Sequence, residues 1–131
     1  MGRQTIVKSR ADRAEAPLSD TVRDAFDWDV ARALVDGMPG GRINIAHEAL
    51  DRHVTAGRGE SEALRWLGRD GARRVFTYDD LARAASRFAG VLAAHGLDHG
   101  ARLYSLLGRE PETWIAALGT LKAGLTFTPL F

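Results

Sequence analysis

Apolar residues recur at regular spacings over most of this chain, but the first 27 residues show no lasting periodicity. Residues 1–27 are polar and charged and include Pro17, so we interpret them as a mobile N-terminal segment. From Trp28 the spacing becomes helical, with an apolar side formed by Val30, Ala31, Leu34 and Val35. The glycine-rich stretch 37–41 is expected to end this short helix.

The pattern next predicts a second helix and a β-hairpin. Asn44 is a favourable N-cap for a helix over Ile45 to Val54, because its side chain can accept from the free N–H groups of the first turn. The apolar face of this helix is expected to consist of Ile45, Ala49 and Leu50. Glu62 to Leu67 and Arg73 to Phe76 read as hairpin strands, since the Asp-Gly pair between them suits a tight turn with positive φ angles.

A longer amphipathic helix is predicted to begin after Thr77. The Thr77 hydroxyl can accept a hydrogen bond from the Asp80 amide, which is the arrangement of an N-terminal helix cap. The apolar stripe has helical spacing and consists of Leu81, Ala85, Phe88 and Leu92. Gly96 is expected to end the helix in a left-handed conformation.

The last third of the chain predicts one strand–helix–strand unit with parallel strands. Strands are expected at Arg102 to Leu107 and Leu125 to Leu130, joined by a helix from Pro111 to about Ala123. The helix is apolar on more than one side, so we expect burial of Trp114, Ile115, Leu118 and Leu121. The predicted fold class is α/β, with α+β character in the N-terminal half.

The final strand is apolar enough to predict burial between neighbours on both faces. The chain supplies no further segment for that purpose, so we expect it to be the N-terminal part of a larger protein. An unpaired apolar strand at this edge also predicts marginal stability or poor solubility.

Composition narrows the classes of function. The 18 basic and 17 acidic residues give a net charge of +1, so overall charge gives no reason to expect nucleic acid or an anionic membrane as a partner. The sequence has no cysteine, which excludes disulfides, thiolate metal sites and cysteine nucleophiles. No apolar run approaches the roughly 20 residues of a membrane span, and the N-terminus does not resemble a secretory signal. We therefore expect a cytoplasmic protein.

Common catalytic signatures are missing from the sequence, including a Walker phosphate loop, a complete dinucleotide fingerprint and a nucleophile elbow. His47 and Asp51 share a helix face, which superficially resembles a zinc-binding helix, but no third ligand is apparent. A solvated ion pair four residues apart is the favoured interpretation. His95 and His99 flank a helix end and are expected to interact with its dipole.

One loop is a candidate for proximity to a ligand. Arg109 and Glu110 follow a parallel strand at its C-terminal end, where open α/β sheets bind ligands. The plainer interpretation is an exposed polar turn. Trp66 and Trp114 lie in an apolar strand and helix, so core packing is expected of both.

Three segments together resemble one enzyme family. Asn44 to His53 resembles the N-x-A-x-E-A-x-D-R-H stretch of AMP-forming acetyl-CoA synthetases. Phe76 to Leu81, continued by Ser86 to Ala89, is similar to the T-Y-x-E-L helix start of the adenylate-forming superfamily. Gly108 to Phe131 resembles its P-E…L-K-x-G…P-L segment, and the ending P-L-F favours the acetyl-CoA synthetase-like branch. Each motif alone is weak evidence for the family, but the order and spacing of the three motifs together make the resemblance specific.

The resemblance implies an AMP-binding (adenylation) domain over residues 28–131, incomplete and lacking the rest of its first subdomain. Enzymes of this family join a carboxylate such as acetate to ATP and then pass the acyl group to coenzyme A. The implied cofactors of a full-length enzyme are ATP, Mg²⁺ and coenzyme A. The family's phosphate-binding loop, nucleotide contacts, metal ligand and catalytic lysine come later in its chain. We therefore transfer no catalytic, cofactor-binding or metal-binding residue, and we expect these 131 residues alone to be inactive and to bind none of the cofactors tightly.

Two other functions stay open at this point. The chain could be a non-catalytic binding or assembly module that pairs its apolar C-terminal strand with another chain or with a second copy of itself. A flavodoxin-like nucleotide binder would need more parallel strands than the one unit that the pattern predicts. The sequence does not identify the acyl substrate.

Overall fold

The computed structural model describes residues 24–130, which divide into two compact units at Val35 and Asp36. The first unit contains the short helix α3 (Trp28–Ala33), as the apolar spacing predicts. The Asp27 carboxylate caps this helix by accepting from the Asp29 N–H at 2.7 Å. No residue of α3 is buried, and the apolar side chain of Val30 is 63% exposed.

In the second unit, a helical stretch over residues 45–58 contains two π-helical segments, η1 (His47–Asp51) and η2 (Val54–Arg58). Gly57 within η2 departs from helical geometry, with a φ of 77°. The predicted cap is confirmed, because the Asn44 side-chain oxygen accepts from the Ala46 N–H at 2.9 Å. The predicted apolar face is wrong at Ile45, which is 62% exposed. Ala46 and Leu50, four residues apart, take the inward positions, and this turns residue 45 outward.

The hairpin and the long helix follow as predicted. Strand β1 (Glu62–Leu67) pairs antiparallel with β2 (Arg73–Thr77), and Leu67 lies opposite Arg73 at the turn. Helix α4 (Tyr78–Ala94) has a complete capping box, in which the Thr77 hydroxyl accepts from the Asp80 N–H at 3.1 Å. The Asp80 carboxylate accepts from the Thr77 N–H in return at 3.1 Å. The main cause of the lowered pKa of Asp80 is this backbone hydrogen bond.

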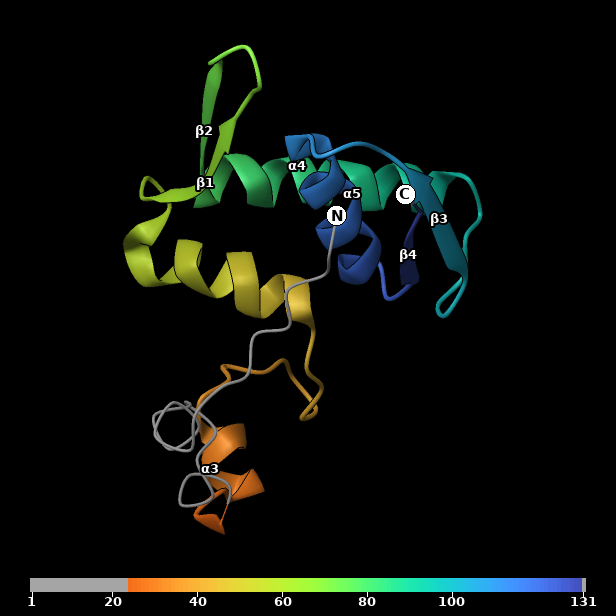
Figure 1. The fold of residues 1–131 in the computed structure, drawn as a ribbon. Coiled ribbons are helices and arrows are strands. Elements are labelled where there is room, and N and C mark those ends of the chain that lie inside the picture. Colours follow the sequence, from red (N-terminus) through yellow and green to blue (C-terminus); the bar gives the residue numbers. More distant parts are fainter. Residues whose placement is uncertain (1–23, 131) are drawn as a thin grey trace, which may run out of the picture. The chain divides into compact units, whose positions relative to one another are not determined.

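The strand–helix–strand unit confirms the predicted α/β class. Strand β3 (Arg102–Leu106) leads through a loop to α5 (Pro111–Lys122), and β4 (Thr126–Leu130) returns parallel to β3. Gly124 ends α5 with a φ of 74°, the left-handed conformation that a glycine adopts without strain. Helices α4 and α5 pack against each other (Figure 1).

The core of the second unit lies where the helices meet the hairpin. Leu50, Leu81 and Ala85 form its buried centre, and Leu64, Phe76, Ile115 and Leu118 pack around them. The backbones of α4 and α5 come close together at Gly119. A Cβ atom at that position would lie 2.7 Å from the Ala85 carbonyl oxygen. The contact between the helices therefore depends on a small residue.

One burial prediction for the last third of the chain is wrong. Trp114 is 58% exposed, because α5 buries its small residues Ala116, Gly119 and Thr120 in the close contact instead. Strand β4 is largely open to solvent, although Leu125 just before it is buried. The parallel sheet has two strands, so one face stays uncovered and exposes Tyr104, Leu106 and Leu130. Within residues 24–130, no helix combines the length and the apolar character that crossing a membrane requires.

Candidate functional site

The loop around Arg109 lies between the C-terminal end of β3 and the first turn of α5. Pro111 occupies the first turn, where its fixed φ angle suits a helix start. The Gly108 carbonyl oxygen accepts from the Thr113 hydroxyl at 2.8 Å, and the Glu110 carbonyl oxygen accepts from the Thr113 N–H at 3.1 Å. These contacts hold the loop against the helix that follows it.

The hairpin supports the same loop from a distant part of the sequence. The Trp66 Nε1–H donates to the Arg109 carbonyl oxygen at 2.7 Å, across 43 residues of chain. Arg74 of β2 forms an ion pair with Glu112 of α5 at 2.9 Å. This hydrogen-bonded pair is the main cause of the lowered pKa of Glu112. Trp66 is half-buried and ties two elements together, a role that goes beyond the core packing expected of it.

Two hollows meet at this loop, and Arg109 and Glu110 line both of them. The first has a volume of about 770 Å³ and is otherwise lined by the hairpin residues Trp66, Leu67, Gly68, Arg69 and Asp70. The second has a volume of about 420 Å³ and is otherwise lined by Gly108, Thr113, Trp114, Ala117, Phe127 and Pro129. The position singled out from the sequence therefore does border cavities of ligand size. The contribution of the hairpin was not predicted, because no local pattern links Trp66 to a loop so far along the chain.

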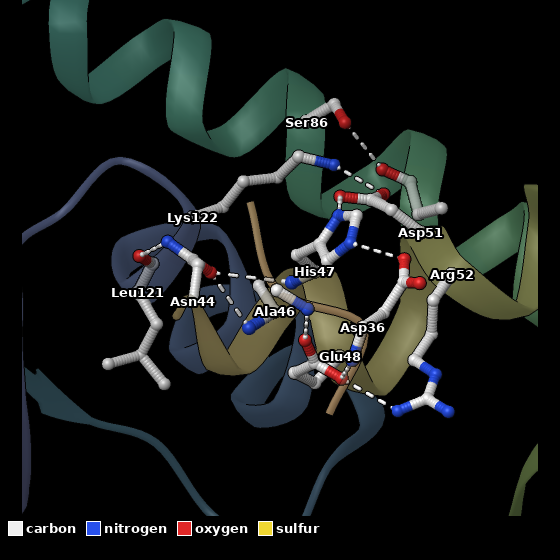
Figure 2. A network of polar contacts seen from close by, with 12 residues as sticks. Asp36, Asn44, Ala46, His47, Glu48, Asp51, Arg52, Ser86, Leu121 and Lys122 are labelled. Atoms are coloured by element: carbon white, nitrogen blue, oxygen red, sulfur yellow. Dashed lines mark hydrogen bonds and ion pairs between the residues drawn. The ribbon is translucent and has the colours of Figure 1, made fainter. Parts of the chain in front are cut away.

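A separate polar network surrounds the helical stretch at His47 (Figure 2). The His47 Nε2 atom lies 3.1 Å from the Asp36 carboxylate, and its Nδ1 atom lies 4.0 Å from the Asp51 carboxylate. Asp51 also accepts from the Lys122 Nζ at 2.7 Å, which joins η1 to the end of α5. The expected pair of His47 and Asp51 is confirmed, and Asp36 is a partner that the spacing could not reveal. Among the described residues, no group of three His, Cys, Asp or Glu side chains is placed to hold a metal ion.

Glu48 is the most strongly perturbed carboxylate of this network. It accepts from the backbone N–H groups of Gly37 at 2.7 Å and Asp36 at 3.0 Å, and from Arg52 at 2.7 Å. These bonds, led by the one from Gly37, lower the pKa of Glu48 to about 2. The two backbone hydrogen bonds hold the segment at residues 36–37 against the helical stretch that carries Glu48.

The remaining histidine candidates, His95 and His99, line neither of the two hollows at the Arg109 loop. His95 is the residue at the C-terminal end of α4, as expected. The His99 ring packs against Gly124, where a Cβ atom would lie 2.6 Å from the ring Cδ2. His99 therefore occupies space that only a glycine leaves open, and it lines a small hollow with Asn44 and Lys122.

The sequence was compared with family models and with known proteins, and the two comparisons agree. The model of the family described as "AMP-binding enzyme" matches residues 50–131. The acetyl-coenzyme A synthetase of Mycobacterium tuberculosis (strain H37Rv) is 36% identical over 109 residues, which are 82% of this chain and 17% of that protein. The acetyl-coenzyme A synthetase of Chlorobaculum tepidum is 37% identical over 92 residues, 70% of this chain and 14% of that protein.

The fold comparison agrees with the sequence comparison. The crystal structure of the Brucella canis acyl-CoA synthetase aligns with a TM-score of 0.76 and 33% identity over 86% of this chain and 20% of its own. This chain thus spans about a sixth of the length of the curated relatives that it matches.

Proposed function

The chain belongs to the AMP-binding enzyme family, and on that premise we propose that it forms part of the adenylation domain of an acetate–CoA ligase-like enzyme. The observation that carries the proposal is the β3–loop–α5–β4 unit. It lies within the matched residues 50–131, and its loop borders the two hollows of about 770 and 420 Å³. The fold and sequence similarity to acyl-CoA and acetyl-CoA synthetases support the same assignment.

The proposed reaction has two steps. A carboxylate oxygen attacks the α-phosphate of ATP, giving an acyl-adenylate and pyrophosphate. The thiol of coenzyme A then attacks the acyl carbon, giving an acyl-CoA and AMP. The relatives are named acetyl-coenzyme A synthetases, so a small carboxylate is the proposed substrate class.

We propose no site for the nucleotide phosphates or Mg²⁺ among the described residues of this chain. They include no cluster of metal-ligating side chains, and the sequence has no Walker phosphate loop. We therefore assign no step of the reaction to them. The proposed role of this segment is to build the scaffold around the Arg109 loop, which Trp66 and the Arg74–Glu112 pair hold in place.

A chimera tests this function within one polypeptide. The matched segment of the Mycobacterium tuberculosis acetyl-CoA synthetase would be replaced by the corresponding part of this chain, and acetate-dependent exchange of pyrophosphate into ATP would be measured. We expect exchange by the chimera and none above a blank by the 131-residue chain alone. A folded chimera that supports no exchange would refute the proposed role, and exchange by the chain alone would refute its inactivity.

A second candidate function is favoured by the open face of the parallel sheet. Tyr104, Leu106 and Leu130 are 61%, 80% and 45% exposed, and parallel sheets normally have both faces covered. A non-catalytic assembly module would use this face and the β4 edge to pair with another chain or with a second copy. Sedimentation of the purified chain discriminates, because a monomer at every concentration would exclude self-association.

A further inference from the structure

A small polar hollow of about 220 Å³ lies where the segment before η1, the turn after α4 and the end of α5 meet. Among the described residues that line it, Arg42, His99 and Lys122 are basic, and none carries a carboxylate. We call this site the Arg42 hollow. It shares no lining residue with the two hollows at the Arg109 loop, so it is a separate feature of the fold.

Backbone hydrogen bonds fix the segments that form the Arg42 hollow. The Arg42 carbonyl oxygen accepts from the Met38 N–H at 2.8 Å, which closes the tight turn before η1. The Gly124 carbonyl oxygen accepts from the Gly100 N–H at 2.9 Å, which joins the turn after His99 to the end of α5. The hollow is therefore preformed by contacts between segments far apart in the sequence.

Acceptor groups next to the hollow already have partners. The Leu121 carbonyl oxygen accepts from the Asn44 Nδ2 atom at 2.8 Å (Figure 2). The same oxygen accepts from the Gly124 N–H at 3.0 Å. The Asn44 Oδ1 atom accepts from the Ala46 N–H at 2.9 Å. These bonds engage oxygen atoms that would otherwise favour a cation at the C-terminal end of a helix.

Donor groups of the hollow, by contrast, retain capacity for a ligand. The Arg42 side chain has no ion pair with another residue of the described segment 24–130. The Lys122 Nζ atom gives one hydrogen bond to Asp51, at 2.7 Å, and an ammonium group has three N–H donors. The His99 ring has an N–H donor whether it is neutral or charged. The hollow thus combines positive charge with free donors, which suits an anion.

The volume and the donors together indicate the class of anion. A volume of about 220 Å³ lies below the roughly 300–1,000 Å³ of pockets that hold drug-sized ligands, so the hollow suits an ion-sized group. A terminal phosphate carries a charge of about −1.5 to −2 and three strong acceptor oxygens. This number of acceptors matches the three basic side chains of the hollow better than the single charge and two oxygens of a carboxylate do.

We propose that the Arg42 hollow binds a phosphate group, either as the free ion or as the end group of a small phosphate ester. Arg42, His99 and Lys122 donate hydrogen bonds to the phosphate oxygens, and Lys122 keeps its bond to Asp51. This site is independent of the proposed ligase reaction, because its lining residues take no part in the Arg109 loop.

The test is a titration of the isotope-labelled 131-residue chain with inorganic phosphate, followed by nuclear magnetic resonance at constant ionic strength. We expect saturable shifts of the backbone amides at residues 42–44, 99–100 and 122–124. Arg42→Gln should weaken binding about tenfold, as loss of a hydrogen bond from a charged group does. Arg69→Gln is the matched control, because it removes the same charge from the hairpin hollow and should leave the affinity unchanged.

Three results would overturn the proposal. The first is an absence of saturable shifts at the hollow in the unaltered chain. The second is equal weakening by Arg42→Gln and Arg69→Gln, because binding would then follow net charge alone. The third is acetate binding as tightly as phosphate, which would contradict the match of three acceptor oxygens. Circular dichroism checks that each variant folds, and His99→Gln is a second variant that should also weaken binding.

Glycerol phosphate distinguishes the two sources of the phosphate group. Binding as tight as that of inorganic phosphate would show that the hollow accepts the end group of an ester. Weaker binding would assign the site to the free ion. In both cases the Arg42→Gln variant should lose affinity for the ligand that binds.

Discussion

Substituting Gly119 by alanine tests the close contact between α4 and α5 directly. A Cβ atom at residue 119 would lie 2.7 Å from the Ala85 carbonyl oxygen and 2.9 Å from the Phe88 Cδ1 atom. The phenyl ring has some freedom to move, but the Ala85 carbonyl belongs to the backbone in the middle of α4. The two helices must therefore separate to accommodate one methyl group.

The change in the free energy of unfolding caused by Gly119→Ala is the balance of two opposing effects. Alanine is favoured over glycine inside a helix by about 1 kcal/mol. Forcing an additional carbon into a well-packed contact costs about 1–3 kcal/mol. We expect the packing cost to lie near the upper end of this range, because the Ala85 carbonyl is a backbone group and cannot change rotamer to make room. We expect Gly119→Ala to lower the free energy of unfolding by about 1–2 kcal/mol.

Gly90 of α4 provides a matched control. No atom lies within 4 Å of a Cβ built at Gly90, and the residue is solvent-exposed. Gly90→Ala should therefore raise the free energy of unfolding by about 0.5–1 kcal/mol, through helix propensity alone. Urea unfolding followed by circular dichroism measures both variants. A Gly119→Ala variant as stable as Gly90→Ala would show that the helices do not meet as described.

Two further predictions concern local hydrogen bonds. Thr77→Ala removes the cap of α4 and should lower the free energy of unfolding by about 1 kcal/mol. Thr77→Ser keeps the hydroxyl and should lower it little. Equal losses of stability in the two variants would contradict the capping role. Glu48 has a folded-state pKa of about 2, below its ordinary value of 4.5, so its contribution to stability is complete above pH 4.5 and is lost as the pH falls toward 2. The unfolding free energy of Glu48→Gln should therefore fall less over that range than that of the unaltered chain, and parallel pH profiles would refute this assignment.

The elements that the sequence predicted are those whose signals are local. The Asn44 and Thr77 caps, the hairpin itself and the stop at Gly124 are confirmed. Of the Asp-Gly pair in the hairpin turn, Gly71 has the expected positive φ angle, at 83°, and Asp70 does not. Each depends on contacts within a few residues of chain, so the residue types nearby contain the information. The observed bounds of β1 match the prediction, and β2 extends one residue further, to Thr77.

Burial was predicted less well, because it depends on which elements meet. Ile45 and Trp114 are apolar and were expected inside, yet both are exposed. For Trp114 the reason is steric: α5 approaches α4 through Gly119, and the large side chain of the same helix is left on another side. The apolar character of a helix reveals that it has a partner, but it does not reveal which side the partner occupies.

The candidate site likewise combines features that the sequence predicted with features that only the tertiary structure shows. The sequence identified the loop at Arg109 from its position after a parallel strand, and the resemblance to acetyl-CoA synthetases identified the family. Only the tertiary structure shows that Trp66 donates to that loop from the hairpin and that two hollows meet there. It also shows that Asp36 is a partner of His47.

The sequence by itself thus determined the caps, turns, order of elements and family, because these depend on neighbouring residues and on ordered motifs. The close helix contact, the exposed Trp114 and the pairing of distant residues were decided by the tertiary structure, because they arise from steric fit between segments far apart in the chain.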